Sequence, residues 1–448
     1  MSEARTPALS IARLSLSQFR NHAATAFTCT AAPVVLTGPN GAGKTNILEA
    51  VSLLAPGQGL RRAAYGELTR VSAVDAVAAV RESATSDLRE HAAVASDGAP
   101  RASNAGAQPA GPWAVAAQVR TPDGTFDIGT GLDPKRARAA AAAGTASAYR
   151  TSGSGATGGR IVRIDGEPQS GSGALAAYVS VVWLTPAMDG LFTGPAGERR
   201  RFLDRLTLGF ESTYRTQLAQ FERSMRARNR LLDDGVREPA RFTGLEQIMA
   251  ETGVAVAAAR RATIAQLAAT IEARLRAVPD SAFPFARLQL EGTLEDDLAT
   301  AAAVDVEDAY AQTLQRMRER DRAAGRTLVG PHRSDLTVFH GPKGLPGRVC
   351  STGEQKALLT GLILAQAALM KRARGGVAPL LLLDEVAAHL DAARRAALFD
   401  ALIDLETQAW MTGTDRSAFA RLDEGGGRGG GAQFFHVAEG GQVSQMSA

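Results

Sequence analysis

A phosphate-binding loop is the first feature of this sequence that carries chemistry. Residues 38–45 read Gly-Pro-Asn-Gly-Ala-Gly-Lys-Thr, which matches the pattern G-x-x-x-x-G-K-[ST] in full. Glycine lacks a Cβ, so such a loop wraps closely around phosphate and aims backbone N–H groups at its oxygens. Lys44 adds positive charge for the β- and γ-phosphates, and the Thr45 hydroxyl is a ligand for Mg²⁺. The residues predicted to bind ATP here are Gly38, Pro39, Asn40, Gly41, Ala42, Gly43, Lys44 and Thr45.

A strand that ends in two acids supplies the second half of this chemistry. Residues 379–385 read Pro-Leu-Leu-Leu-Leu-Asp-Glu, and a run this apolar predicts a fully buried parallel strand. Ionised carboxylates are costly to bury without partners, so two adjacent acids at the end of such a strand indicate function rather than packing. We expect Asp384 to hold Mg²⁺ opposite Thr45. Glu385 and Lys44 are the predicted catalytic residues, with Glu385 orienting the attacking water or accepting its proton.

A third motif opens an apolar helix between these two. Residues 351–355 read Ser-Thr-Gly-Glu-Gln, the form of the ABC-type signature. Alone the motif is weak, because serine is a common helix N-cap, but its position before the Asp-Glu strand strengthens it. In ABC-type ATPases the signature contacts the γ-phosphate held by a partner subunit, with the helix N-terminus facing the anion. We therefore expect ATP to drive homodimerisation through signature residues acting in trans: Ser351, Gly353, Glu354 and Gln355.

A strand, a helix and a hairpin are predicted to position the loop. The apolar run 34–36 predicts a buried strand just before it, and a helical pattern follows it. Residues 11–19 alternate in the strand sense, and residues 27–30 predict the return strand of a hairpin. Arg20 and Asn21, in the turn of that hairpin, either bind ATP by facing its adenine or ribose, or form a plain polar turn.

Further strands are predicted where alternating or apolar runs are bounded by turn residues. They are a hairpin at 113–120 and 125–132, a strand pair at 161–164 and 178–184, a strand at 335–340 that resumes the ATPase sheet, a buried strand at 408–411 and a final hairpin at 434–443. Together with the motifs they predict an α/β fold. It is an ABC-type P-loop ATPase head, a mixed sheet with flanking helices, interrupted by a helical arm.

Three segments follow from this pattern. We expect residues 1–186 to form the N-terminal half of the ATPase lobe, with flexible Ala-, Gly- and Ser-rich insertions at about 83–112 and 134–160. Residues 187–325 change to long helical patterns and form the predicted arm, too short for a long coiled coil. Residues 326–448 are the predicted C-terminal half of the lobe, which holds the signature and the Asp-Glu strand.

The arm carries a concentration of arginine. Residues 194–232 hold nine arginines against four acids. This balance fits either a phosphate-facing surface for DNA or a solvated helix face with i,i+4 pairs such as Glu222 with Arg226. Under the first interpretation, the candidates for DNA binding are four arginines of the arm and two that follow the first helix. They are Arg199, Arg200, Arg226 and Arg228 in the arm, and Arg61 and Arg62 after the helix.

Composition narrows the class of protein further. The chain has 448 residues, 50 basic against 46 acidic side chains, and a net charge of +4, which permits nucleic-acid binding without requiring it. The two cysteines, Cys29 and Cys350, form no C-x-x-C pair, so we expect neither a zinc site nor a disulfide. No apolar run reaches the length of a membrane span or a signal peptide. These features favour a cytoplasmic protein that does not enter a membrane.

The motifs together resemble the RecF family of bacterial recombination and gap-repair ATPases, relatives of the SMC proteins. They are Leu-Ser-Gln-Phe-Arg-Asn at 16–21, the loop at 38–46, Ser-Leu-Leu-Ala-Pro-Gly at 52–57, Glu-Arg-Arg-Arg-Phe-Leu-Asp at 198–204, Gly-Pro-His-Arg-Ser-Asp at 330–335 and Ser-Thr-Gly-Glu-Gln-Lys at 351–356. The resemblance implies ATP- and Mg²⁺-dependent dimerisation on DNA, with slow DNA-stimulated hydrolysis, in replication restart and the SOS response. It also implies DNA with gaps or single-strand/double-strand junctions as the substrate, and RecR, RecO and RecA as partners.

Two other functions share part of this pattern. An ABC transporter ATPase subunit has the same three motifs, but the long arginine-rich interruption disfavours it. So does the lack of the glutamine and histidine that transporters place after two strands, where Thr185 and Thr412 stand. A hydrolytically inert ATP-dependent scaffold is disfavoured by Glu385, since a dead site would tolerate its loss.

Overall fold

The computed structural model describes residues 9–70, 112–134, 159–211, 213–279, 281–424 and 431–446. The predicted insertions at 83–112 and 134–160 lie almost entirely outside the described residues. The chain divides into two compact units: unit 1 holds residues 1–183, 379–386 and 406–448, and unit 2 holds residues 184–378 and 387–405. These boundaries differ from those of the three predicted segments, because the signature helix groups with the helical region rather than with the ATPase sheet.

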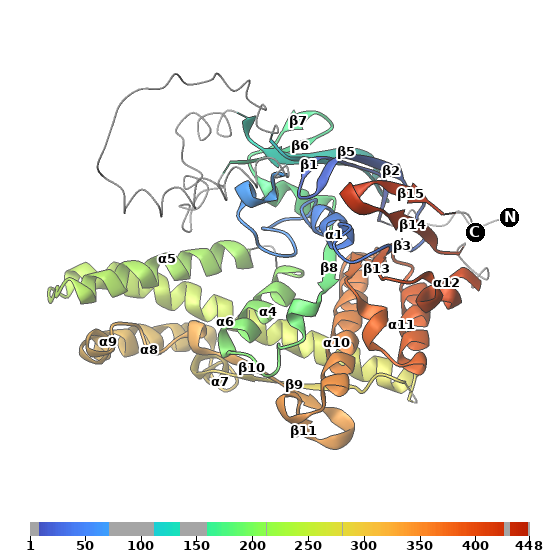
Figure 1. Cartoon of the computed structure of the whole chain (residues 1–448). Helices are drawn as coiled ribbons and strands as arrows, with labels where there is room; N and C mark the ends of the chain where they lie inside the picture. Colours follow the sequence, from blue (N-terminus) through green and yellow to red (C-terminus); the bar gives the residue numbers. More distant parts are fainter. Residues whose placement is uncertain are drawn as a thin grey trace, which may run out of the picture. The chain divides into compact units, whose positions relative to one another are not determined.

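A largely parallel sheet forms the centre of unit 1 (Figure 1). Its strand order is β15-β14-β3-β13-β12-β8. The strands are β3 (Val34–Thr37), β8 (Val181–Leu184), β12 (Leu380–Leu383), β13 (Ala409–Thr412), β14 (Gln433–Val437) and β15 (Val443–Gln445). Strands β3, β12, β13 and β14 pair in parallel, and β15 returns antiparallel to β14. All four leucines of β12 are buried, as expected for a strand covered on both faces.

An antiparallel sheet completes unit 1, with strand order β2-β1-β4-β5-β6-β7. Its strands are β1 (Ser10–Phe19), β2 (His22–Thr28), β4 (Ala114–Thr121), β5 (Gly124–Leu132), β6 (Arg160–Ile164) and β7 (Glu167–Pro168). The hairpin predicted at 113–132 is confirmed, and the N-terminal hairpin is present with a return strand, β2, that covers His22–Thr28 instead of the predicted 27–30. The predicted strand pair at 161–164 and 178–184 is wrong. Strand β6 pairs with β5 and β7, whereas β8 joins the parallel sheet, because Asp165-Gly166 turns the chain directly into β7.

Helices and short 3₁₀ turns connect these strands in both units. The α-helices are α1 (Lys44–Ser52), α4 (Ala196–Leu208), α5 (Tyr214–Asp233), α6 (Ala240–Ala277), α7 (Thr293–Asp297), α8 (Ala303–Arg316), α9 (Arg318–Ala324), α10 (Thr352–Ala373), α11 (Ala392–Leu405) and α12 (Ala420–Glu424). The 3₁₀ turns used below are η1 (Tyr65–Leu68), η5 (Pro331–Arg333) and η10 (Glu439–Gly441).

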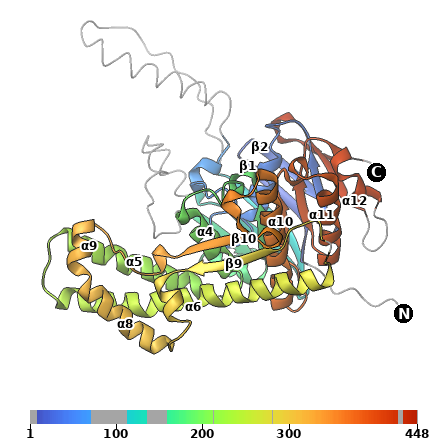
Figure 2. The same ribbon diagram turned by 90° about the horizontal axis from the view of Figure 1, so that it is seen from below.

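Unit 2 joins the helical region to a small antiparallel sheet. The sheet has the order β11-β10-β9, with β9 (Ala286–Glu291), β10 (Asp335–His340) and β11 (Leu345–Pro346). The prediction that the strand at 335–340 resumes the ATPase sheet is therefore wrong. Strand β10 pairs along its length with β9, which follows the long helix α6 (Figure 2).

Helices α5 and α6 lie side by side and form the body of the predicted arm (Figure 1). A core of buried side chains joins them to α8, with Phe221, Met249 and Tyr310 among its members. Met317 separates α8 from α9. Helix α6 begins at Ala240, with Pro239 as its N-cap residue.

Helix α6 is long and apolar enough to cross a membrane by length and composition alone. Its apolar side chains, however, pack inside unit 2, where Met249, Val254 and Ala257 belong to the core. It also buries Glu246 and Arg260, each in an ion pair. Packing within unit 2 therefore accounts for the apolar composition of this helix.

Candidate nucleotide site

The phosphate-binding loop occupies the turn between β3 and α1 and needs glycine at two positions. Gly38 has a φ of 145°, and a Cβ placed there would lie 2.2 Å from the carbonyl oxygen of Val437. Gly43 has a φ of 109°, and a Cβ there would lie 2.5 Å from the Asn21 side chain. Both backbone conformations and both close approaches exclude a larger residue. The loop is thus shaped as the sequence pattern predicts.

Lys44 points its ammonium group back along this loop. Its Nζ donates to the carbonyl oxygens of Gly38, at 2.6 Å, and Pro39, at 2.9 Å. Burial lowers the pKa of Lys44, while the carboxylates of Glu385 and Asp384 act to raise it. The predicted phosphate ligand and the two predicted acids of β12 therefore share one electrostatic environment within unit 1.

Asp384 lies between two threonine hydroxyls. Thr45 Oγ1 donates to Asp384 Oδ1 at 2.9 Å, and Thr412 Oγ1 donates to the same oxygen at 2.7 Å. Asp384 is buried, at 8% exposure, so these hydrogen bonds offset the cost of removing its carboxylate from water. The predicted pairing of Asp384 with Thr45 is present in the fold, and Thr412 is an additional partner.

Glu385 follows with a strained backbone. Its φ of 54° lies in the left-handed region, which costs a non-glycine residue roughly 1–3 kcal/mol. The Glu385 N–H donates to Thr412 Oγ1 at 2.8 Å, so one hydroxyl orients both acids. Sequence reasoning missed Thr412, which it noted only as a replacement for histidine. The available signal was its position at the end of β13, the strand that pairs with both β12 and β3.

These residues fit a magnesium nucleotide. A hydroxyl and a carboxylate are oxygen ligands, which Mg²⁺ prefers, and those of Thr45 and Asp384 already lie 2.9 Å apart. In the part of the chain that the structure describes, no group of three or more His, Cys, Asp and Glu side chains could hold a metal by itself. An ion held here would complete its shell with water and phosphate oxygens, as Mg²⁺ usually does.

Arg20 and Asn21 lie against the loop, with their polar groups engaged by protein. Arg20 Nε and Nη2 each donate to the buried carboxylate of Glu49 at 2.8 Å. Asn21 Nδ2 donates to the carbonyl oxygen of Ala42 at 2.8 Å, and its Oδ1 accepts from Asn46 Nδ2. The structure thus assigns these two residues contacts with the loop and with α1, and their predicted contact with adenine or ribose stays a prediction.

The predicted signature forms the exposed N-terminus of α10, in unit 2. Ser351 is the N-cap and makes a capping box with Glu354: Ser351 Oγ accepts from the Glu354 N–H at 3.4 Å, and Glu354 Oε2 accepts from the Ser351 N–H at 3.0 Å. Hydrogen bonds from Lys343 and then from Ser351 lower the pKa of Glu354 to about 2. Gln355 Nε2 donates to the carbonyl oxygen of Cys350 at 2.9 Å. Gly353 is exposed, so the first turn is open to an anion.

Two of the sequence motifs contact each other in unit 2. Arg199 of α4 forms a bidentate pair with Asp335, at 2.8 and 2.7 Å, and Arg200 Nη1 donates to the carbonyl oxygen of Ser334. Arg260 of α6 connects the same motifs by binding Asp204, at 2.6 Å, and the Pro331 carbonyl. The motifs at 198–204 and 330–335 therefore hold α4 to the start of β10. This contact engages the guanidinium of Arg199 and weakens its predicted DNA role.

Helix α5 separates its arginines onto two faces. Arg228 is completely buried, with its guanidinium bound to Glu246, Asp321, Thr327 and the Leu314 carbonyl. The prediction that Arg228 contacts DNA is therefore wrong. Two residues turn an α-helix by about 200°, so Arg226 and Arg228 cannot share a face. The exposed arginines, which we call the α5 arginine stripe, are Arg215, Arg223, Arg226 and Arg230.

The stripe has the geometry of an extended surface. At 100° per residue, its four positions fall within an arc of about 80°, and they span about 22 Å of helix. Arg226 pairs with Glu222 at 3.5 Å, with both side chains 49% exposed, so this pair is weak. Arg61 and Arg62, the remaining predicted DNA contacts, are exposed in unit 1.

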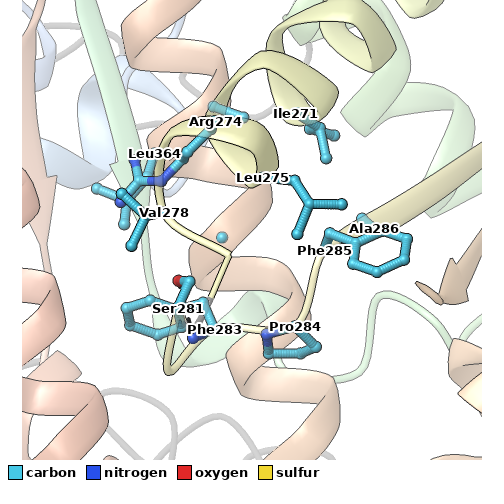
Figure 3. A pocket seen from close by; sticks show the side chains of 12 residues that line it. Ile271, Arg274, Leu275, Val278, Ser281, Phe283, Pro284, Phe285, Ala286 and Leu364 are labelled. Atoms are coloured by element: carbon cyan, nitrogen blue, oxygen red, sulfur yellow. Dashed lines mark hydrogen bonds between the residues drawn. The ribbon is translucent and has the colours of Figure 1, made fainter. Parts of the chain in front are cut away.

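An apolar hollow lies elsewhere in unit 2 (Figure 3). It measures about 450 Å³, including the open solvent at its mouth. The end of α6, the loop before β9 and one face of α10 line it, with Leu275, Phe283 and Leu364 among the apolar side chains and Arg274 at its wall. None of the residues predicted to bind nucleotide lines it.

Comparison with known proteins identifies the family of this chain. Residues 10–424 match the model of the RecF/RecN/SMC N-terminal domain. The chain is 45% identical over 431 residues to the DNA replication and repair protein RecF of Mesorhizobium japonicum, covering 96% of each protein. This chain belongs to the RecF family. The RecF protein of Brucella suis is 44% identical to it over 438 residues, which cover 98% of this chain and 97% of that protein.

Solved structures of RecF share the fold of this chain over its whole length. The recombination mediator protein RecF with ATP, from the RecFOR pathway, has a TM-score of 0.74 at 18% identity and covers 100% of both chains. A second RecF structure from that pathway has a TM-score of 0.73 and covers 99% of both. The predicted fold class, an α/β head of the RecF/SMC type with a helical insertion, is confirmed.

Proposed function

We propose that this RecF-family chain is an ATP-dependent DNA-binding protein of recombinational gap repair and replication restart. It acts in the cytoplasm as a switch that dimerises on ATP, closes on DNA and opens after hydrolysis. The observation that carries the ATP part is the cluster of Thr45, Asp384, Thr412 and Glu385 beside the phosphate-binding loop. A solved RecF structure with ATP has the same fold and supports the same assignment.

Different residues of this chain have different roles in ATP hydrolysis. The loop from Gly38 to Gly43 binds phosphate through backbone N–H groups, and Lys44 exchanges its two carbonyl partners for phosphate oxygens. Thr45 and Asp384 would hold Mg²⁺, and the ion would supply positive charge that neutralises the phosphates. Glu385 orients the attacking water and accepts its proton, with its backbone held by Thr412. The absence of a histidine after β13 fits slow turnover.

The open N-terminus of the signature helix supports the proposed dimerisation. The first turn of α10 exposes Ser351, Thr352 and Gly353, so its N–H groups and dipole are available to a phosphate bound by a second copy. Each copy thus completes the site of the other. ATP binding then becomes the event that brings two chains together.

The α5 arginine stripe is the proposed DNA surface of the arm. Guanidinium groups bind phosphate in a bidentate manner, and about 22 Å of stripe covers about two-thirds of a turn of duplex DNA. Gapped DNA and single-strand/double-strand junctions are the proposed substrates. RecR, RecO and RecA are the proposed partners, on the strength of the family alone.

Sedimentation velocity of the Glu385→Gln chain tests the proposal, because this variant binds ATP without consuming it. We expect a dimer that co-sediments with a gapped duplex only when ATP and Mg²⁺ are present, and a monomer for the Lys44→Ala control. A Glu385→Gln chain that remains monomeric with ATP, or a dimer that ignores DNA, would contradict the proposal. Turnover separates it from an inert scaffold, since equal rates for the parent and Glu385→Gln would remove Glu385 from catalysis.

A further inference from the structure

The turn between β1 and β2 lies directly behind the phosphate-binding loop. Asn21 binds the loop carbonyl of Ala42, and Arg20 binds Glu49 of α1. His22, the first residue of β2 after this turn, is completely buried. The sequence motif that contains the turn ends at Asn21, so pattern reasoning gave His22 no role.

The His22 ring bridges two distant segments of unit 1. Its Nε2 lies 3.2 Å from the carbonyl oxygen of Gly43, the N-cap residue of α1. That oxygen also accepts the first hydrogen bond of the helix, from the Ile47 N–H at 3.1 Å. On the other side, Nδ1 lies 3.0 Å from the carbonyl oxygen of Gly441, in the turn η10 between β14 and β15. The ring therefore connects the end of the loop to the C-terminal hairpin.

The hydrogen-bond chemistry of this bridge is specific. Both partners are carbonyl oxygens, which only accept, so a neutral ring donates either from Nε2 to Gly43 or from Nδ1 to Gly441. Burial lowers the pKa of His22, which favours the neutral ring with a single N–H. Thr25 Oγ1 lies 3.1 Å from Nδ1 and donates to the Gly441 oxygen at 2.8 Å, so that carbonyl has a donor other than the ring, which leaves the ring proton for Nε2 and Gly43. An aliphatic side chain at position 22 would leave the Gly43 bond unmade.

Steric contacts confirm that the three segments meet closely. A Cβ on Gly43 would lie 2.8 Å from His22 Nε2, and a Cβ on Gly441 would lie 2.5 Å from His22 Nδ1. The same hairpin meets the other end of the loop, where Val437 leaves no room for a Cβ on Gly38. Both ends of the phosphate-binding loop thus rest on the C-terminal hairpin, one of them through His22.

We propose that His22 is a positioning residue for the nucleotide, which fixes the Gly43 carbonyl so that the loop N–H groups face phosphate. Through Gly441 it also links the conformation of the loop to the C-terminal hairpin. This inference rests on the proposed function, since it requires that the loop binds ATP. A purely structural role predicts something different: loss of the ring would lower the stability of the fold and leave nucleotide affinity unchanged in the molecules that remain folded.

Equilibrium binding of a fluorescent ATP analogue with Mg²⁺, alongside thermal unfolding of each variant, tests this inference. Replacing His22 by Leu removes the donor to Gly43, and we expect Kd to rise about ten-fold, the equivalent of one hydrogen bond. His22→Gln supplies an amide donor, and we expect it to restore most of that affinity. Thr25→Val leaves the Gly43 bond in place and should raise Kd by about two- to five-fold through the hairpin contact.

His436→Leu is the matched control, because His436 is an exposed histidine on β14 of the same hairpin. Its Kd should stay within about two-fold of the parent's. If His22→Leu does not fold, His22→Gln and Thr25→Val carry the test. Folded variants at positions 22 and 25 that all bind the analogue like the parent would overturn the inference and leave the proposed function intact. A parent chain that does not bind the analogue would overturn both.

Discussion

Arg228 offers a direct test of how the helices of unit 2 are held together. Its guanidinium is fully buried and donates to Glu246 at 3.0 Å, Asp321 at 2.7 Å, Thr327 at 3.0 Å and the Leu314 carbonyl at 2.7 Å. These partners come from α6, α8, α9 and the segment after α9. Arg228→Met keeps much of the apolar stem and removes the charge and all four bonds.

The two acids respond differently to this change. Glu246 keeps its second arginine, because Arg318 Nε donates to it at 2.9 Å. Within the described part of the chain, Asp321 is left with one backbone donor, the Leu328 N–H at 3.1 Å, while remaining completely buried. Breaking a buried ion pair from one side costs about 3–5 kcal/mol, because a buried charge loses its compensation. We expect Arg228→Met to lower the free energy of unfolding by that amount.

Urea unfolding at pH 7 measures the loss of unfolding free energy, and two further variants test its cause. Arg226→Met changes a half-exposed arginine on the same helix and should cost at most about 0.5 kcal/mol. Adding Asp321→Asn to Arg228→Met removes the stranded charge and should recover about 1–2 kcal/mol. A loss below about 1 kcal/mol for Arg228→Met, or no recovery in the double variant, would refute the reasoning.

Three further predictions follow from the same contacts. Thr412→Val frees the Glu385 backbone, so we expect ATP turnover in steady-state kinetics to fall at least about ten-fold. ATP affinity in equilibrium binding should change little, and unchanged turnover would show that Thr412 has no role in the site. Replacing Arg223, Arg226 and Arg230 of the α5 arginine stripe by Ala should reduce the slope of log K against log salt for DNA binding by about 2.7, whereas an equal slope would exclude the stripe as a phosphate surface. Burial lowers the pKa of His332 below its unfolded value, so its contribution to stability is present above about pH 6.5 and is lost as pH falls through the folded pKa. His332→Gln should therefore flatten the loss of stability between pH 7 and 5 in urea titrations, and a parallel curve would contradict this sign.

The charge control for the stripe experiment comes from the same unit. A triple alanine variant of exposed arginines on α6 and α9 removes the same net charge from other helices. It should weaken DNA binding less than the stripe variant does, because its positions form no continuous face. The control residues are Arg241, Arg276 and Arg320.

The sequence by itself determined the chemistry of the nucleotide site. Glycine, lysine and threonine at fixed spacing define a loop because the backbone conformation and the close approach are local properties. The leucine run before Asp384 likewise predicts a buried strand without any knowledge of its neighbours. Both predictions are local in this sense, and the structure shows the loop, the strand and the bond between Thr45 and Asp384.

Only the tertiary structure decided what meets across the chain. Thr412 joins the site because β13 pairs with β3 and β12, and His22 because residues more than 400 positions apart meet behind the loop. Composition likewise could not separate Arg226 from Arg228, since both are arginines on one helix and only packing against α6, α8 and α9 buries one of them. Local sequence fixes backbone conformation and chemical type, whereas burial and partners depend on segments that folding brings together from far along the chain.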